Sequence, residues 1–173
     1  ARGASSNAGA LVAIADRIDS LVGLFSVGLV PKSTADPFAL RRAALGVVQT
    51  VIAAGYNVDL RDMVRISAGS IADQTGKDVP LDVQDAVLEF IAKRLEGYLL
   101  DNVGIRDDVV KTVLKVKRNE RNVVLARALC ETISAMINED KEKIDMAQEA
   151  HSRAARLLNS IKDVSMDELV SAR

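Results

Sequence analysis

Residues 36–46 read Asp36-Pro37-Phe38-Ala39-Leu40-Arg41-Arg42-Ala43-Ala44-Leu45-Gly46, and this stretch marks the start of a helix. Asp36 suits the N-cap position, because its carboxylate can accept the free amide protons of a first helical turn. Pro37 then occupies the first helical position, where its missing N–H costs no hydrogen bond. Apolar residues, Phe38 and Leu45 among them, recur at helical spacing until Gly55 offers a left-handed terminus. The stretch therefore predicts an amphipathic helix of about five turns.

The composition of the 173-residue chain favours an aliphatic helical core. Hydrophobic residues make up 49% and charged residues 27%, which is typical of a folded protein and not of a disordered tail. Aromatic residues reach only 3%, and no stretch alternates polar and apolar residues as a strand would. We therefore expect an all-α fold, a multi-helix bundle of about eight helices in two packed groups. The expected helices cover residues 8–27, 36–54, 59–71, 82–102, 106–116, 119–137 and 144–161, with a short terminal helix after a capping box at 165–168.

Residues 73–80, Asp-Gln-Thr-Gly-Lys-Asp-Val-Pro, form the clearest linker because they are rich in helix breakers and polar groups. This linker predicts a first helical domain over residues 1–72 and a second helical subdomain over residues 81–173. We expect no membrane span, because charged residues interrupt the most hydrophobic region before it reaches the roughly 18 apolar residues required. Residues 1–9 are small and polar with no initiating Met, which suggests a piece of a longer chain.

The sequence lacks the usual signatures of a catalytic site. It contains no glycine-rich phosphate loop, no nucleophile elbow and no cysteine pair with metal-ligand spacing. The single cysteine, Cys130, lies among apolar and helix-forming residues, which predicts a buried thiol in a reducing compartment. We therefore expect no catalytic residue, metal or cofactor in this segment.

Three groups of cations, the third weaker than the others, are candidates for contact with RNA phosphates. Arg41 and Arg42 are adjacent and so about 100° apart on a helix, which leaves one to support packing and the other to reach outwards. A guanidinium suits phosphate because it keeps its charge and offers a planar fork of donors. A second basic stripe, opposed by Glu120 alone, could follow an RNA backbone although the chain has a net charge of −1. This stripe consists of Lys111, Lys115, Lys117, Arg118, Arg121 and Arg127, and Arg153, Arg156 and Lys162 form a weaker third cluster.

The alternative, that these cations are structural or lie on solvated helix faces, stays open at this point. No aromatic residue is interleaved with the basic stripe in the sequence. This argues against stacking of single-stranded bases as the main mode of contact.

A second motif precedes residues 36–46. Residues 15–25 read Ala-Asp-Arg-Ile-Asp-Ser-Leu-Val-Gly-Leu-Phe, and a loop containing Gly28 and Pro31 follows. In this order the segments resemble the patterns A-D-[KR]-x-D-[ST]-L-V-G-x-F and D-P-F-A-L-R-R-A-A-L-G of the bacterial-type glycyl-tRNA synthetase, in its β subunit or the β-type half of a fused organellar enzyme. The motif residues are Asp16, Asp19, Gly23, Asp36 and Pro37. A weaker match to a later family motif occurs at residues 150–158. It retains Arg153 and the apolar positions, whereas Ser152 and Arg156 replace the family's lysine and asparagine.

The resemblance implies that residues 1–72 are the end of an HD-like helical domain, in which Asp16 matches the late aspartate of the HD metal pattern. The histidine ligands of that pattern would lie upstream, and the one histidine of this chain, His151, is more than a hundred residues away. No metal site can therefore be assembled from these residues.

Asp16 and Asp19 lie three residues apart and so on adjacent positions of one helical face. We expect them to pair with Arg17, Arg41 or Arg42 across a helix interface. Such pairs would pin the two motifs together.

The resemblance implies a non-catalytic tRNA-recognition and assembly segment of glycyl-tRNA synthetase, which supports ATP-dependent attachment of glycine to tRNA(Gly). ATP and Mg would be used by the catalytic α subunit or a fused α-type half, in an α2β2 or fused dimeric enzyme. The compartment would be the bacterial cytoplasm, or a plastid or mitochondrion. Two alternatives stay open. One is a recruited or degenerate synthetase-like scaffold subunit in another complex, and the other is a fragment of an HD-type phosphohydrolase with upstream histidines and a divalent metal.

Overall fold

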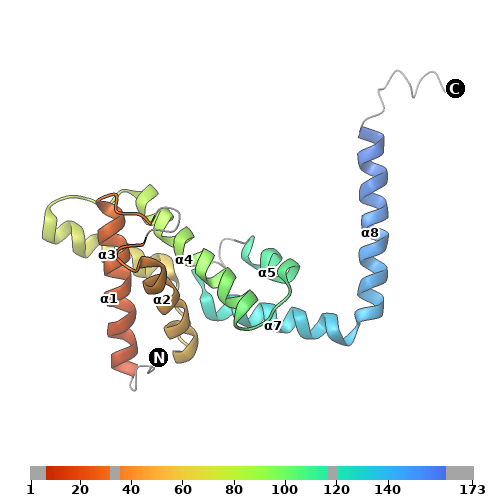
Figure 1. The fold of residues 1–173 in the computed structure, drawn as a ribbon, viewed down its shortest axis with the longest axis horizontal. Helices are drawn as coiled ribbons and strands as arrows, with labels where there is room; N and C mark the ends of the chain where they lie inside the picture. Colours follow the sequence, from red (N-terminus) through yellow and green to blue (C-terminus); the bar gives the residue numbers. More distant parts are fainter. Residues whose placement is uncertain (1–6, 32–35, 117–120, 163–173) are drawn as a thin grey trace. The chain divides into compact units, whose positions relative to one another are not determined.

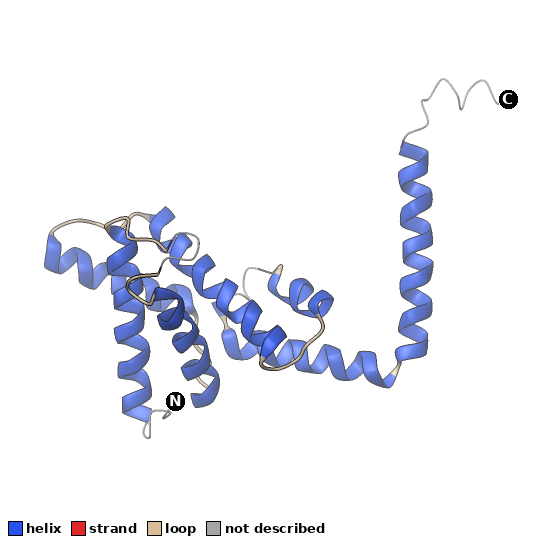
Figure 2. Cartoon of the chain, in the orientation of Figure 1, coloured by secondary structure: helices blue, strands red, loops and turns tan. Residues whose placement is uncertain are grey.

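The structure, a computed structural model, describes residues 7–31, 36–116 and 121–162, and every regular element in these ranges is a helix (Figures 1 and 2). The absence of strands from the described residues agrees with the predicted all-α fold. The predicted terminal helix after residues 165–168 lies outside the described residues. The described helices are α1 (Asn7–Ser26), α2 (Leu40–Ala54), α3 (Leu60–Thr75), α4 (Leu81–Asp101), α5 (Asp107–Leu114), α7 (Val123–Glu139) and α8 (Lys141–Lys162).

The chain divides into two compact units, residues 1–132 and residues 133–173. In the first unit α1 packs on α2 and α3, and α4 packs against all three (Figure 1). The boundary between the units therefore lies elsewhere than at the expected linker, residues 73–80. These residues contain the end of α3 and the turn before α4. The physical reason is that α4 buries one stripe at a spacing of four, and that stripe joins the core of the preceding helices. The stripe consists of Val87, Ile91, Leu95 and Leu99.

The core of the first unit is aliphatic, as the composition predicts. Its largest fully buried side chains are Ile14, Ile18, Leu21, Val22, Leu40, Val47, Val48, Val51, Leu60, Ile91, Leu95 and Leu99. The neighbours α1 and α2 run antiparallel, since Tyr56, just after α2, lies beside the first residue of α1. Its hydroxyl donates to the Asn7 carbonyl oxygen at 3.0 Å.

Helix α2 begins at Leu40, four residues later than the predicted start at residue 36. Asp36 caps the helix across an intervening turn, which is closed by a hydrogen bond from the Ala39 N–H to the Asp36 carbonyl oxygen at 3.1 Å. The two Asp36 carboxylate oxygens accept from the backbone N–H groups of Leu40 and Arg41 at 2.8 and 2.9 Å. Ala39 adopts a left-handed conformation with φ 54°, which carries a steric cost for a residue with a Cβ. Asp36 is thus a cap, as predicted, but the helix does not start beside it.

Three other helix ends follow from local side-chain and backbone chemistry. The Asp59 carboxylate accepts from the Arg61 N–H at 2.8 Å and caps α3, as predicted. Gly55 ends α2 in the left-handed conformation expected of it, with φ 66°. Asn122 caps α7 by accepting from the Leu125 N–H at 2.9 Å, so α7 starts four residues later than the predicted 119.

The second unit contains the end of α7 and α8. A break at Asp140 separates these two helices. No described side chain between residues 133 and 157 is buried. Within the described ranges, no helix combines the length and the apolar character that a membrane span requires.

Candidate nucleic-acid interface

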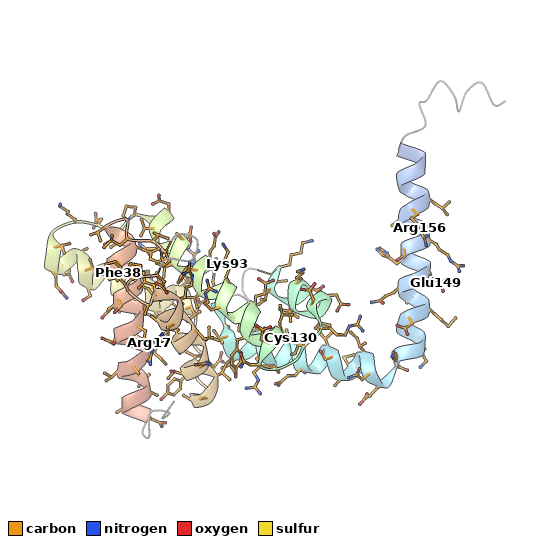
Figure 3. The ribbon with its side chains drawn as sticks, in the orientation of Figure 1. Arg17, Phe38, Lys93, Cys130, Glu149 and Arg156 are labelled. Carbon is orange, nitrogen blue, oxygen red and sulfur yellow. The ribbon has the colours of Figure 1, made fainter. Side chains whose placement is uncertain are left out.

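The two sequence motifs meet where α1 packs on α2, and Arg17 makes the contact (Figure 3). Arg17 is half-buried, and its Nη1 donates to the Ala13 carbonyl oxygen at 2.7 Å. Its guanidinium lies over Gly46, where a Cβ would stand only 2.5 Å from the Arg17 Nε. A glycine is therefore required at position 46 if Arg17 is to keep this place.

The expected ion pairs of Asp16 and Asp19 are not formed. Both carboxylates are exposed, and neither makes an ion pair with any described residue. The prediction was wrong because the buried stripe of α1, which includes Ile14 and Ile18, occupies a different side of the helix from the two aspartates. Gly23 lies instead toward α3, where a Cβ would be in ordinary contact with Ile71 at 3.9 Å.

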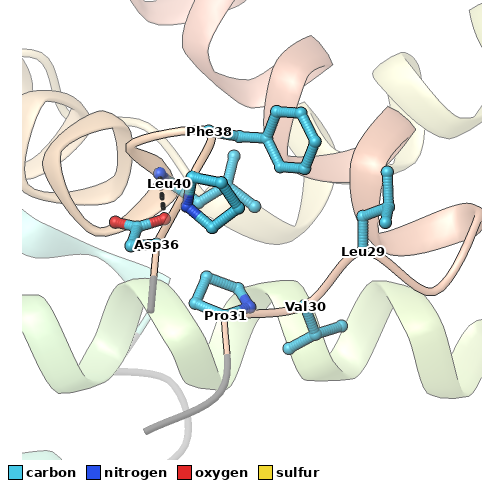
Figure 4. A pocket seen from close by; sticks show the side chains of 7 residues that line it. Leu29, Val30, Pro31, Asp36, Phe38 and Leu40 are labelled. Atoms are coloured by element: carbon cyan, nitrogen blue, oxygen red, sulfur yellow. Dashed lines mark hydrogen bonds between the residues drawn. The ribbon is translucent and has the colours of Figure 1, made fainter. Parts of the chain in front are cut away.

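The turn before α2 forms one wall of an apolar pocket of about 200 Å³ (Figure 4). Phe38 is 50% exposed there, which corrects the prediction that it lies on the buried side of the helix. The Asp36 carboxylate already accepts from two backbone N–H groups of α2, so the described lining of the pocket offers no unsatisfied charge. Residues 32–35 are outside the described residues. The lining residues are Leu29, Val30, Pro31, Asp36, Pro37, Phe38 and Leu40.

The two adjacent arginines of α2 differ in exposure, as their separation of about 100° around the helix predicts. Arg41 is half-buried, and its backbone N–H is bonded to Asp36. Arg42 is exposed. Arg42 is therefore the outward member of the pair and the one available to a ligand.

Both ends of the basic stripe are held by carboxylates one turn away. Lys111 pairs with Asp107 at 2.8 Å, and this hydrogen bond is the main reason that the pKa of Lys111 is raised. Arg127 pairs with Glu131 at 2.7 Å, which likewise raises its pKa. Exposed pairs of this kind are weak because solvent screens them, so they do not prevent either cation from meeting a phosphate.

Between these ends, Lys115 is exposed and forms no ion pair with the described residues, and Arg121 is half-buried. Lys117 and Arg118 are outside the described residues. In the second unit, Arg153 pairs with Glu149, one turn earlier in α8. Of the candidate cations that the structure describes, Arg41 and Arg42 lie on α2, Lys111 on α5, Arg127 on α7 and Arg153 on α8, whereas Lys115 and Arg121 lie outside these helices.

Cys130 is buried in α7, as predicted, and burial raises the pKa of its thiol (Figure 3). A raised pKa keeps the thiol protonated and makes it a poor nucleophile. Among the described residues, no three His, Cys, Asp or Glu side chains come close enough to hold a metal ion.

Sequence reasoning missed a cation–π contact on α4. The Arg94 guanidinium lies over the Phe90 ring, 5.2 Å from its centroid. Phe25 of α1 meets the same ring edge-on, with the centroids 5.3 Å apart. The signal was present in the sequence, because Phe90, Arg94 and Tyr98 follow one another at the four-residue spacing that brings side chains together on a helix.

Comparison with known proteins identifies the family. Residues 2–115, which contain both motifs and α1 to α5, match the family described as glycyl-tRNA synthetase beta subunit. This chain belongs to the glycyl-tRNA synthetase beta subunit family. The match confirms the resemblance seen in the two motifs.

Individual relatives extend the similarity over most of the chain. The glycine–tRNA ligase chloroplastic/mitochondrial 2 of Arabidopsis thaliana is 38% identical over 161 residues, which cover 93% of this chain and 14% of that protein. The glycine–tRNA ligase beta subunit of Syntrophotalea carbinolica is 44% identical over 106 residues, or 61% of this chain and 15% of the relative. The glycine–tRNA ligase beta subunit of Geotalea daltonii is 38% identical over 136 residues, which cover 79% of this chain and 19% of that protein. The chain thus spans less than a fifth of the length of each of these relatives.

Proposed function

We propose that this chain is a non-catalytic tRNA-recognition and assembly segment of a glycyl-tRNA synthetase, and that it supports ATP-dependent attachment of glycine to tRNA(Gly). The observation that carries the proposal is the family match over residues 2–115. Relatives named as glycine–tRNA ligases, both bacterial beta subunits and an organellar form, support it. In this proposal the compartment is the bacterial cytoplasm or a plastid or mitochondrion.

The proposed partners are a catalytic α subunit, or a fused α-type half, and tRNA(Gly). ATP and Mg would bind to the catalytic part, in an α2β2 or fused dimeric enzyme. The packed helices of the first unit would serve as a rigid support that presents cations to the tRNA. Rigid helices suit this role because they hold long side chains in place at little further entropic cost.

Exposed cations on two helices of the first unit are suited to contact with RNA phosphates. Arg42 is exposed on α2, Lys111 is exposed on α5, and Lys115 follows α5 directly. Each phosphate that such a cation neutralises releases counterions, so binding should weaken with salt. The slope of log affinity against log salt falls by about 0.9 per lost contact on a duplex and by about 0.7 on a single strand.

The test is tRNA(Gly) binding by the full enzyme that contains this segment, measured over a range of salt concentrations. Replacing Arg42, Lys111 and Lys115 by Ala should weaken binding and flatten the salt dependence, and leave the melting temperature almost unchanged. Arg65→Ala is the matched control, since Arg65 is an exposed cation of α3 held by Asp62 and is not a candidate.

Two results would count against the proposal in different ways. If the triple variant keeps both affinity and salt slope, tRNA contact lies outside these residues. If the full enzyme binds no tRNA(Gly) and attaches no glycine to it, the chain is a synthetase-like scaffold subunit instead.

A further inference from the structure

One flank of α4 alternates aromatic rings with a cation. Phe90, Arg94 and Tyr98 lie one turn apart on this flank, and all three are half-buried. Phe25 of α1 contacts the Phe90 ring edge-on and holds it in place. The guanidinium of Arg94 in turn lies over the Phe90 ring. The Arg94 side chain is therefore held in a defined direction before any ligand arrives.

Arg94 has no anionic partner in the described part of the chain. It forms no ion pair or hydrogen bond with any described residue, and its Nε is buried without an acceptor. By contrast, Arg61 of the neighbouring α3 binds Asp85 at 2.7 Å. A half-buried guanidinium without a carboxylate is unusual, because desolvation of a cation has a cost that a partner normally offsets.

The residues one helical turn from Arg94 on α4 carry no negative charge. The positions three and four residues away on either side are Phe90, Ile91, Gly97 and Tyr98, none of them acidic.

We propose that this flank, formed by Phe90, Arg94 and Tyr98, is a contact site for unpaired nucleotides of RNA. Arg94 would bind a backbone phosphate, and the Tyr98 ring would stack on the adjacent base. Aromatic rings interleaved with cations are the usual platform for single-stranded nucleic acid, because every base offers a face for stacking. The inference rests on the proposed tRNA recognition and names a further place on the chain where it occurs.

The experiment measures binding of a tRNA(Gly) transcript to the full enzyme, with two variants that separate the two contacts. Arg94→Ala should weaken binding about tenfold and lower the salt slope by about 0.7, since one phosphate contact on a single strand is lost. Tyr98→Ala should weaken binding at least about fivefold with no change of slope, since stacking releases no counterions. Tyr98→Phe keeps the ring and should bind as the unaltered enzyme does.

Lys93→Ala is the matched control for charge. Lys93 is the exposed neighbour of Arg94 on α4, and successive residues of a helix point about 100° apart. Its loss should change affinity less than about twofold. Thermal unfolding of each variant checks that it is folded. If Arg94→Ala does not fold, Arg94→Lys is used in its place. Lysine keeps the positive charge but lacks the planar guanidinium that stacks on the Phe90 ring. Weaker binding is then expected without a change of the salt slope.

The outcomes separate this inference from the proposed function. If the enzyme binds tRNA(Gly) with unchanged affinity in the folded Arg94 and Tyr98 variants, the flank is not an RNA contact, and the proposed function is unaffected. If Tyr98→Ala and Tyr98→Phe weaken binding equally, base stacking is excluded. If the unaltered enzyme does not bind tRNA(Gly), both the proposed function and this inference are overturned.

Discussion

At the residue scale, the contact of Arg17 with Gly46 ties the two motifs together. In the Arg17→Ala protein, Gly46→Ala should stabilise the fold by about 1 kcal/mol, because alanine is the better helix former. With Arg17 present, the same change should instead destabilise the fold by about 1 kcal/mol, because the added Cβ would stand 2.5 Å from the Arg17 Nε. Urea unfolding of the four proteins in a double-mutant cycle measures this coupling.

Gly69→Ala is the control for that cycle. Gly69 lies within α3, and a Cβ there would meet nothing within 4 Å. It should therefore stabilise the protein whether or not Arg17 is present. Equal effects of Gly46→Ala in both backgrounds would show that Arg17 does not constrain position 46.

At the element scale, the start of α2 depends on a single carboxylate. Asp36→Ala removes the acceptor for two backbone N–H groups, and we expect a loss of about 1–2 kcal/mol in the free energy of unfolding. Asp36→Asn keeps one acceptor oxygen and should lose less. Thermal unfolding with circular dichroism measures both variants, and Asp73→Ala, an exposed aspartate in the last turn of α3, serves as the control. A loss in Asp73→Ala as large as that in Asp36→Ala would contradict a specific capping role.

At the scale of the whole molecule, α4 completes the core of the first unit. Ile91→Ala should cost about 2–5 kcal/mol, because Ile91 is fully buried in the stripe that faces the other helices. Leu81→Ala on the same helix should cost far less, since Leu81 is 72% exposed. Hydrogen exchange should show faster opening of α1 and α2 in Ile91→Ala, because they share this core. If only α4 exchanged faster, α4 would be a separate unit, as a boundary at residues 73–80 would require.

Features that depend on neighbouring residues were open to prediction from the sequence alone. Helical spacing of apolar residues predicts the all-α fold, and Asp36, Gly55 and Asp59 are recognisable as helix ends because caps act within one turn. The two motifs together identified the family. The location of Cys130 in a buried stripe also followed from its apolar neighbours.

The tertiary structure alone decided which distant residues meet. Helical periodicity states which residues share a face, but the rotation and crossing of packed helices depend on side-chain shapes along the whole interface. For this reason Arg17 lies on Gly46 while Asp16 and Asp19 face solvent, against expectation. The same cause brings Phe25 of α1 against Phe90 of α4, a contact that no local pattern in the chain could reveal.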